Sequence, residues 1–350
     1  MSDWKRLALA PPRAVGAPAG RARLRQLPED FEVNEELGFT AAGRGEHLLL
    51  QVRKRLANTQ WVARELARRA GVRPFDVGYA GLKDRHAVTT QWFTVPARGR
   101  RPEDWLGVEG EGYAVLAAHA HTRKLPRGAL AANRFRVVLR DFSGDPQQLA
   151  QHVAAAARDG VPNYFGPQRF GRDLGNLRGA DAAGEPSMAR GFELSAIRSL
   201  LFNAVLAERV QRGDWRCLHV GERANLDGSN SSFVVDGTDA TLQARLDALD
   251  IHPTGPLHGC GASGIGGEVA ALEATVIERY AEWAARLAAD RVAAARRPLR
   301  VAVRDLALSA EASDGSHVLS FRLRPGSFAT TVLREFVDFE GAASTEEQDD

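Results

Sequence analysis

Two parts of the chain, far apart in sequence, show the apolar alternation of half-buried β-strands, and this pattern constrains the fold most. Leu48, Leu50 and Val52 make one apolar row near the start of the chain. The same alternation returns much later, over residues 299–303 and again over residues 318–322. Successive strand residues point to opposite faces, so such rows indicate strands with one face in a core. We therefore predict one sheet whose two parts are separated in the sequence by an inserted domain.

The stretch between these parts changes to helical stripes and glycine-rich loops. Apolar residues recur at helical spacing over residues 194–205, and again over residues 269–287. Pro298 marks a point where the chain can leave the insertion. We predict a disordered lead-in over residues 1–20, a sheet domain over residues 21–159 and 300–340, an inserted domain over residues 160–299, and an acidic tail over residues 341–350.

Two helices are predicted within the first part of the sheet domain. Asn58 is a good N-cap for a helix that carries the apolar stripe Val62, Leu66 and Ala70. A second helix is predicted from Pro146 to Arg158, because the glycine that follows at position 160 is a common helix stop.

Composition restricts the class of protein. With 350 residues, of which 44% are hydrophobic and 26% charged, the chain is long enough for two globular domains. No segment approaches the roughly 20 apolar residues of a membrane span, and the N-terminus lacks a signal-peptide core, so we expect a cytoplasmic protein with no membrane partner. Two cysteines, Cys217 and Cys260, are too few for a disulfide framework.

The charge distribution favours a polyanionic partner. Four acids lie within residues 346–350, so the rest of the chain is more basic than the net charge of +2 suggests. The remaining cations gather in short clusters: Arg21, Arg23 and Arg25; Arg53, Lys54 and Arg55; Arg64, Arg68, Arg69 and Arg73; Arg98, Arg100 and Arg101; Arg123, Lys124 and Arg127. If these clusters share one face, they would bind a phosphate backbone; each cluster alone is equally well a solvated surface run.

A single acid, Asp84, stands between the cations Lys83 and Arg85 within residues 78–92. Strand-like residues precede and follow it, which predicts that Asp84 lies in a loop between two strands. Neighbouring cations favour the ionised carboxylate that a nucleophile or a general base requires. An aspartate in a solvated turn is the alternative interpretation.

The segment around Asp84 resembles the signature of the TruD family of tRNA pseudouridine synthases, and other motifs match in the family's order. They are Pro28-Glu29-Asp30-Phe31-Glu32-Val33, Gly45-Glu46-His47, Lys124-Leu125 with Gly128, Asn133-Arg134-Phe135, residues 160–166 with residues 168–171, residues 195–203, and residues 326–335. The resemblance covers roughly residues 21 to 337. It implies an α+β protein with the pseudouridine synthase fold, a mixed and mainly antiparallel sheet flanked by helices, into which an α/β TRUD domain is inserted.

The resemblance also implies an activity and roles for four residues. The expected reaction isomerises uridine to pseudouridine in tRNA, at position 13 in the D-arm, without a cofactor. Asp84 would be the nucleophile, attacking either C6 of the base or C1′ of the ribose. Phe135 would stack on the flipped base, with Asn133 beside it, and Arg25 would pair with Asp84 where the family usually has lysine. The alternative for Phe135 is a core position in the apolar row that continues with Val137.

Further residues are candidates with weaker support. Lys83, Arg85, His86 and Lys124 are possible RNA contacts. Two Cys and two His, in Cys217-Leu218-His219 and His258-Gly259-Cys260, would suffice in number for zinc. Their spacings are tighter than usual ligand pairs, and the resemblance implies no metal, so we expect none. We expect a monomer.

Two other classes of function remain open at this stage. A non-catalytic RNA-binding protein would share the basic clusters but would not need Asp84, Asn133 and Phe135. An RNA hydrolase would need a metal cluster or a histidine pair aimed at phosphate, and the sequence has no such constellation.

Overall fold

The computed structural model describes residues 2–178, 188–310 and 315–340, which form two compact units. The sheet unit contains Gly20–Gly144, Arg304–Gly326 and β17, which is Asp338–Glu340. The helical unit contains the chain up to Ala19, Asp145–Val303 and Ser327–Val337. The predicted tail, residues 341–350, lies outside the described residues.

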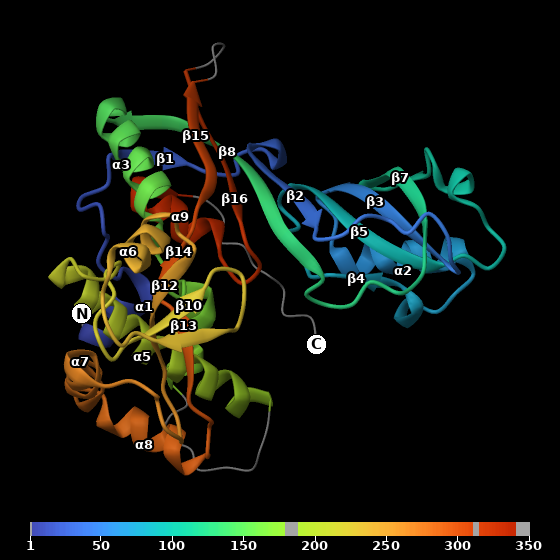
Figure 1. Ribbon diagram of the computed structural model, residues 1–350. Helices are drawn as coiled ribbons and strands as arrows, with labels where there is room; N and C mark the ends of the chain where they lie inside the picture. Colours follow the sequence, from blue (N-terminus) through green and yellow to red (C-terminus); the bar gives the residue numbers. More distant parts are fainter. Residues whose placement is uncertain (1, 179–187, 311–314, 341–350) are drawn as a thin grey trace. The chain divides into compact units, whose positions relative to one another are not determined.

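Within the described residues, the strands of the sheet unit form one eleven-stranded sheet (Figure 1). The main order is β15-β16-β8-β2-β5-β3-β7-β6, with β1 beside β8 and β17, and β4 beside β5. Their bounds are β1 Gly20–Arg23, β2 Phe31–Leu37, β3 His47–Arg55, β4 Gly78–Tyr79, β5 Val88–Pro96, β6 Glu109–Gly110, β7 Tyr113–His121, β8 Leu130–Gly144, β15 Arg304–Ala310, β16 His317–Leu323 and β17 Asp338–Glu340. The pairs β2/β5 and β1/β17 are parallel and the other pairs antiparallel, which confirms the mixed, mainly antiparallel sheet.

Helix α2 (Thr59–Ala70) packs against the sheet, as its predicted apolar stripe requires. The side chain of Asn58 accepts hydrogen bonds from the backbone N–H groups of Gln60 and Trp61, so it caps the helix. Gly71 ends it in the left-handed conformation at φ 68°. Val62, Leu66 and Ala70 are buried together with the β3 row that begins at Leu48.

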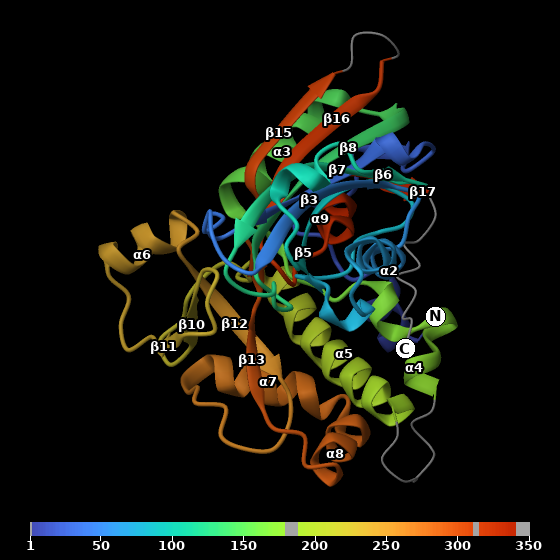
Figure 2. The same cartoon turned by 90° about the vertical axis from the view of Figure 1, so that its right-hand side faces the viewer.

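The helical unit is built around α5 (Met188–Arg212), which is drawn as the long helix in Figure 2. Its other helices are α1 Asp3–Leu9, α3 Pro146–Asp159, α4 Gly175–Arg178, α6 Ala240–Asp247, α7 Gly267–Glu278, α8 Ala281–Ala289 and α9 Ala329–Phe336. A four-stranded sheet in the order β11 (Ser232–Val234), β10 (Arg223–Leu226), β12 (Ile251–Leu257), β13 (Ala295–Pro298) lies beside it, and β9 (Val161–Pro162) pairs with β14 (Arg300–Val301). None of the described helices is long and apolar enough to cross a bilayer.

The two units divide the chain differently from the predicted domains. Helix α3, predicted as part of the sheet domain, packs with α9 in the helical unit. The predicted boundary at Gly160 marks the end of α3, where the glycine has φ 75°, and the change of unit comes earlier, at Asp145. The stripe predicted over residues 269–287 is split into α7 and α8, since Tyr280 between them is non-helical and donates its hydroxyl to Asp3 at 2.6 Å.

The prediction of a disordered lead-in over residues 1–20 is wrong. Residues 3–9 form α1, whose Leu7 and Ala8 belong to the core of the helical unit. The carbonyl of Leu7 accepts a hydrogen bond from the Asn203 amide at 3.2 Å, and Ala14 N–H donates to the carboxylate of Glu335 at 2.8 Å. The high content of Ala, Pro and Gly concealed an apolar helix face only two turns long.

Two leucines of α1 provide a test of this packing. Leu7 is 6% exposed and Leu9 is 46% exposed. We expect Leu7→Ala to lower the free energy of unfolding by about 2–3 kcal/mol, because it leaves a cavity, and Leu9→Ala to lower it by less than about 1 kcal/mol. Urea unfolding of both variants measures the difference. Equal, negligible effects would mean that α1 does not dock.

Candidate active site

Asp84 lies in the loop between β4 and β5, as predicted. The two strands are paired through Gly78 with Thr94 and through Tyr79 with Phe93, so both ends of the loop are fixed to the sheet. The Gln91 amide donates to the carbonyl of Gly81 at 2.5 Å. The hydroxyl of Thr59, at the start of α2, accepts from the backbone N–H of Lys83 at 3.1 Å. The carboxylate is therefore mounted on a firmly anchored loop.

Arg25 and Asp84 are in contact, although 59 residues separate them in sequence. A guanidinium nitrogen of Arg25 lies 2.6 Å from the Asp84 carboxylate, with the two side chains 6% and 18% exposed. The Arg25 guanidinium also lies over the ring of Phe31 at 4.0 Å. Arg25 itself has φ 57°, a left-handed conformation that is unfavourable for a residue with a side chain, and such strain is frequent at functional sites. The contact holds the carboxylate in one orientation.

The side chain of Lys83 lies in a buried ion pair, which argues against its predicted contact with RNA. Its ammonium group forms an ion pair with Glu35 at 2.7 Å, and the side chains are 7% and 0% exposed. The backbone N–H of Trp92 also donates to Glu35 at 3.3 Å. The Lys83 side chain thus points inward, whereas Arg85, two residues later in the same loop, is exposed.

Asn133 and Phe135 of β8 project from the sheet face that this loop covers. Glu35, the partner of Lys83, is in register with Asn133 on the neighbouring strand, and Val33 is in register with Phe135. Residues directly opposite each other in a ladder have Cβ atoms about 4.5–5.5 Å apart. The amide oxygen of Asn133 is buried, and among the described residues it has no hydrogen-bond partner. A buried acceptor without a partner is rare in proteins, which marks Asn133 as a candidate for a functional role.

The ring of Phe135 is enclosed by two other rings. It stacks on Phe321 at 5.2 Å and meets the edge of Phe31 at 6.0 Å, and it is 8% exposed. Such burial is what a core position would show. Phe31 is also the ring beneath Arg25, so Phe135 is connected through one aromatic contact to the cation that holds Asp84.

The other RNA-contact candidates are on the surface. Arg85 and His86 are exposed in the loop itself. The ammonium of Lys124 lies 4.3 Å from the ring centre of Phe75, to whose carbonyl it also donates, and Phe75 is 81% exposed. Arg127 lies over the ring of Tyr79 at 3.8 Å. Exposed cations beside aromatic rings are suited to phosphates and unpaired bases.

One residue of this site was not singled out from the sequence. Lys54 of β3 is 1% exposed, and its ammonium donates to the backbone carbonyls of Ala57 at 2.8 Å, Lys83 at 3.2 Å and Asp84 at 2.8 Å. In the sequence, Lys54 stands in a basic cluster between Arg53 and Arg55. Its position in the strand indicates that it is buried, because Lys54 continues the alternating apolar row of Leu48, Leu50 and Val52.

The Cys and His residues considered for zinc have other contacts. His219 lies 3.1 Å from the carboxylate of Asp214, and the Cys260 sulfur lies 3.6 Å from the carbonyl of Ala288. Both cysteines are exposed thiols. Across residues 2–178, 188–310 and 315–340, no cluster of three or more His, Cys, Asp or Glu could hold a metal ion.

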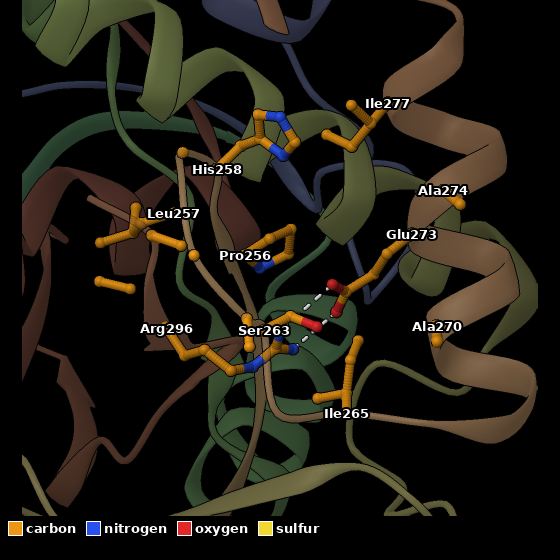
Figure 3. A pocket seen from close by; sticks show the side chains of 15 residues that line it. Pro256, Leu257, His258, Ser263, Ile265, Ala270, Glu273, Ala274, Ile277 and Arg296 are labelled. Atoms are coloured by element: carbon orange, nitrogen blue, oxygen red, sulfur yellow. Dashed lines mark hydrogen bonds and ion pairs between the residues drawn. The ribbon is translucent and has the colours of Figure 1, made fainter. Parts of the chain in front are cut away.

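A cavity of about 330 Å³ in the helical unit carries different chemistry (Figure 3). It is lined by β12, by α7, by the loop between them and by the start of β13, and its walls are mostly alanine, glycine and aliphatic residues. Its two charged side chains neutralise each other, because Arg296 donates to Glu273 at 2.6 and 3.1 Å. Burial lowers the pKa of His258 at its rim, although Glu273 opposes this and Arg198 reinforces it.

Comparison with known proteins agrees with the resemblance read from the motifs. The TruD family model, described as tRNA pseudouridine synthase D, matches residues 14–178 and 175–336. The chain belongs to the TruD family. It is 47% identical over 335 residues to the tRNA pseudouridine synthase D of Methylococcus capsulatus (strain Bath), with 94% of each chain covered. The protein of the same name from Pseudomonas aeruginosa PAO1 is 42% identical over 352 residues, with 99% of each chain covered.

The fold of the TruD family is also found among solved structures. A crystal structure of the Methanosarcina mazei protein assigned as tRNA pseudouridine synthase D aligns with a TM-score of 0.74 at 20% identity. The alignment covers 95% of this chain and 97% of the other. The predicted α+β fold class is thereby confirmed.

Proposed function

We propose that this TruD-family chain isomerises uridine to pseudouridine in tRNA, at position 13 in the D-arm, with Asp84 as the nucleophile. The observation that carries the proposal is the buried contact of 2.6 Å between Arg25 and Asp84 in an anchored loop. The names of relatives that match 94% and 99% of the chain point to the same activity. Cations at the surface of the sheet unit, among them the exposed Arg85 and the half-buried Lys124, suit the polyanionic substrate.

The reaction balances without a co-reactant. The N1–C1′ bond of uridine breaks and a C5–C1′ bond forms; the hydrogen on C5 leaves as a proton, and N1 gains one. The Asp84 carboxylate adds either to C6 of the base or to C1′ of the ribose, and it is released when the isomerised nucleoside is complete. Arg25 keeps the carboxylate directed throughout. The uridine must leave its stack to reach this loop.

Asn133 and Phe135 are proposed to hold the detached base. The amide oxygen of Asn133, which lacks a partner among the described residues, would accept a hydrogen bond from an N–H of the uracil. Phe135 would offer its ring to the base after a small movement against Phe321. A base held on two sides cannot diffuse away between bond breaking and bond formation.

The role of Phe135 can be separated from its packing. Phe135→Leu keeps an apolar side chain of similar volume but removes the ring face. We expect it to slow single-turnover isomerisation by about 10- to 100-fold, since stacking contributes roughly 1–3 kcal/mol per base. The melting temperature should change little. A variant that isomerises uridine at the wild-type rate would show that Phe135 only packs in the core. A large fall in melting temperature with a normal rate per folded molecule would lead to the same conclusion.

The proposed activity is tested by tritium release from tRNA transcripts that carry C5-tritiated uridine. Isomerisation must release the C5 hydrogen to water, whereas RNA binding or phosphodiester hydrolysis leaves it in place. We expect release up to one equivalent per tRNA. Intact tRNA with no release at saturating enzyme would refute the proposed function, and cleaved tRNA would indicate a hydrolase.

A further inference from the structure

Lys54 occupies an unusual position for a lysine. It lies on β3 in the row of buried apolar residues, and its side chain is 1% exposed. Among the described residues its ammonium group forms no ion pair and instead meets three backbone carbonyls: Ala57 at 2.8 Å, Lys83 at 3.2 Å and Asp84 at 2.8 Å. Two of the three acceptors belong to the loop that carries the candidate nucleophile.

A buried ammonium group is costly unless each of its donors is satisfied. Lys54 has three N–H donors and meets three acceptors, so each donor has a partner in one defined arrangement. A neutral apolar side chain of equal length would fill the same space but would leave these three carbonyls without their donor. The ammonium group therefore serves to fix the backbone of the loop.

We propose that Lys54 is a positioning residue for the reaction: its protonated amine fixes the backbone of Lys83 and Asp84, and turnover requires that this amine stay protonated. The proposal rests on Asp84 acting as the nucleophile of the proposed function. It adds a second anchor to the site, since Arg25 holds the carboxylate of Asp84 and Lys54 holds its carbonyl.

Loss of the proton would disturb this arrangement directly. A neutral amine has two N–H groups and one lone pair, so one of the three carbonyls would face a lone pair and be repelled. Displacement of a reacting group by about 1 Å can cost about 100-fold in rate. Deprotonation would also remove the positive charge next to the Asp84 backbone.

The environment of Lys54 brings this change into an accessible pH range. Burial lowers the pKa of Lys54 to about 8, although the negative charge of Asp84 opposes the change and the positive charge of Lys83 adds to it. Arg25 and Glu35 partly neutralise these two loop charges. We therefore expect the single-turnover rate to fall as the pH rises through about 8.

The effect of the same ionisation on stability has the opposite sign. An unfolded chain would keep this lysine protonated up to the ordinary pKa of 10.5, whereas the folded protein releases the proton near 8. Between these values the unfolded state binds more protons, so the contribution of Lys54 to stability rises with pH. The contribution of Lys54 to stability therefore does not explain a fall in the single-turnover rate over this pH range.

The experiment compares wild type, Lys54→Arg and Lys54→Met in single-turnover assays at saturating enzyme from pH 6.5 to 9.5. Arginine stays charged over this range, so the fall above pH 8 should disappear or shift upward in Lys54→Arg. Lys54→Met should be about 100-fold slower at neutral pH, and its tRNA affinity should be unchanged. Its single-turnover rate should show no fall above pH 8 that comes from deprotonation at position 54. Lys5→Met, the same change at a lysine of the helical unit, is the matched control. Ionisation of the substrate uracil affects all four proteins alike.

A second readout does not depend on activity. Amide hydrogen exchange of the peptide that contains residues 81–87 should be faster in Lys54→Met than in wild type, and unchanged in Lys5→Met. Should Lys54→Met fail to fold, the pH profiles of wild type and Lys54→Arg decide. A wild-type rate in Lys54→Met, or the same fall in Lys54→Arg as in wild type, would overturn the proposal. If wild type released no tritium at any pH, the proposed function would fail, and unchanged exchange of the loop would then refute the positioning role separately.

Discussion

Replacing Asp84 by asparagine is expected to lower the single-turnover rate by about 10⁴-fold or more while tRNA affinity stays within about 3-fold of wild type. The amide preserves the shape of the side chain and the backbone carbonyl that accepts from Lys54 at 2.8 Å. It loses the negative charge that meets Arg25 at 2.6 Å and the nucleophilic carboxylate oxygen that would attack the uridine. The measurements are tritium release under single-turnover conditions and filter binding of tRNA.

Asp141→Asn is the matched control for this variant. Asp141 also belongs to the sheet unit and also faces an arginine, Arg23 at 3.6 Å, but both side chains are largely exposed. Exposed pairs of this kind contribute little, so rate and stability should remain close to wild type. A near wild-type rate in Asp84→Asn would exclude Asp84 as the nucleophile, whatever the control shows.

Replacing Arg25 is expected to give a ranked series of rates. Arg25→Lys should remain within about 5-fold of wild type, because it keeps the charge and most of the reach to Asp84. Arg25→Ala should be slower by about 100-fold, since it leaves a largely buried carboxylate without its partner and without direction. The loss should appear in the single-turnover rate and not in tRNA affinity.

The salt dependence of binding distinguishes this role from a phosphate contact. A cation that contacts phosphate would weaken tRNA binding when removed, and it would reduce the slope of log affinity against log salt by about one. Arg6→Ala, which removes an exposed ion pair with Asp3 at 2.8 Å, is the control. An Arg25→Ala variant with weaker binding but an intact rate at saturating enzyme would move Arg25 to the RNA contacts.

The sequence predicted the helix and the strands around the site well, because the patterns that indicate them are local. Asn58 and the stripe of Val62, Leu66 and Ala70 define a helix without reference to the rest of the chain. The strands on both sides of Asp84 follow from alternation in the same way. The pairing of Arg25 with Asp84 was predicted only through the family resemblance, because nothing in a single sequence connects residues so far apart.

Burial of charged residues was the main feature that the sequence did not predict. Lys54 and Lys83 were both assigned to the surface, where lysine usually lies. The ammonium group of Lys54 donates to three backbone carbonyls, and that of Lys83 forms an ion pair with Glu35. Both arrangements depend on residues that only the tertiary structure brings together. The N-terminal helix was missed for a related reason, because Leu7 is buried by partners such as Asn203 that lie far along the chain.

The proposed function is tested most directly by mapping pseudouridine in an unmodified tRNA transcript after incubation with the purified protein. Wild type should convert one uridine, at position 13 in the D-arm, and Asp84→Asn should convert none. Pseudouridine at that position with Asp84→Asn would contradict the role of the carboxylate. A transcript without pseudouridine after exhaustive incubation with wild type would contradict the proposed activity, and pseudouridine only at another position would contradict the proposed site.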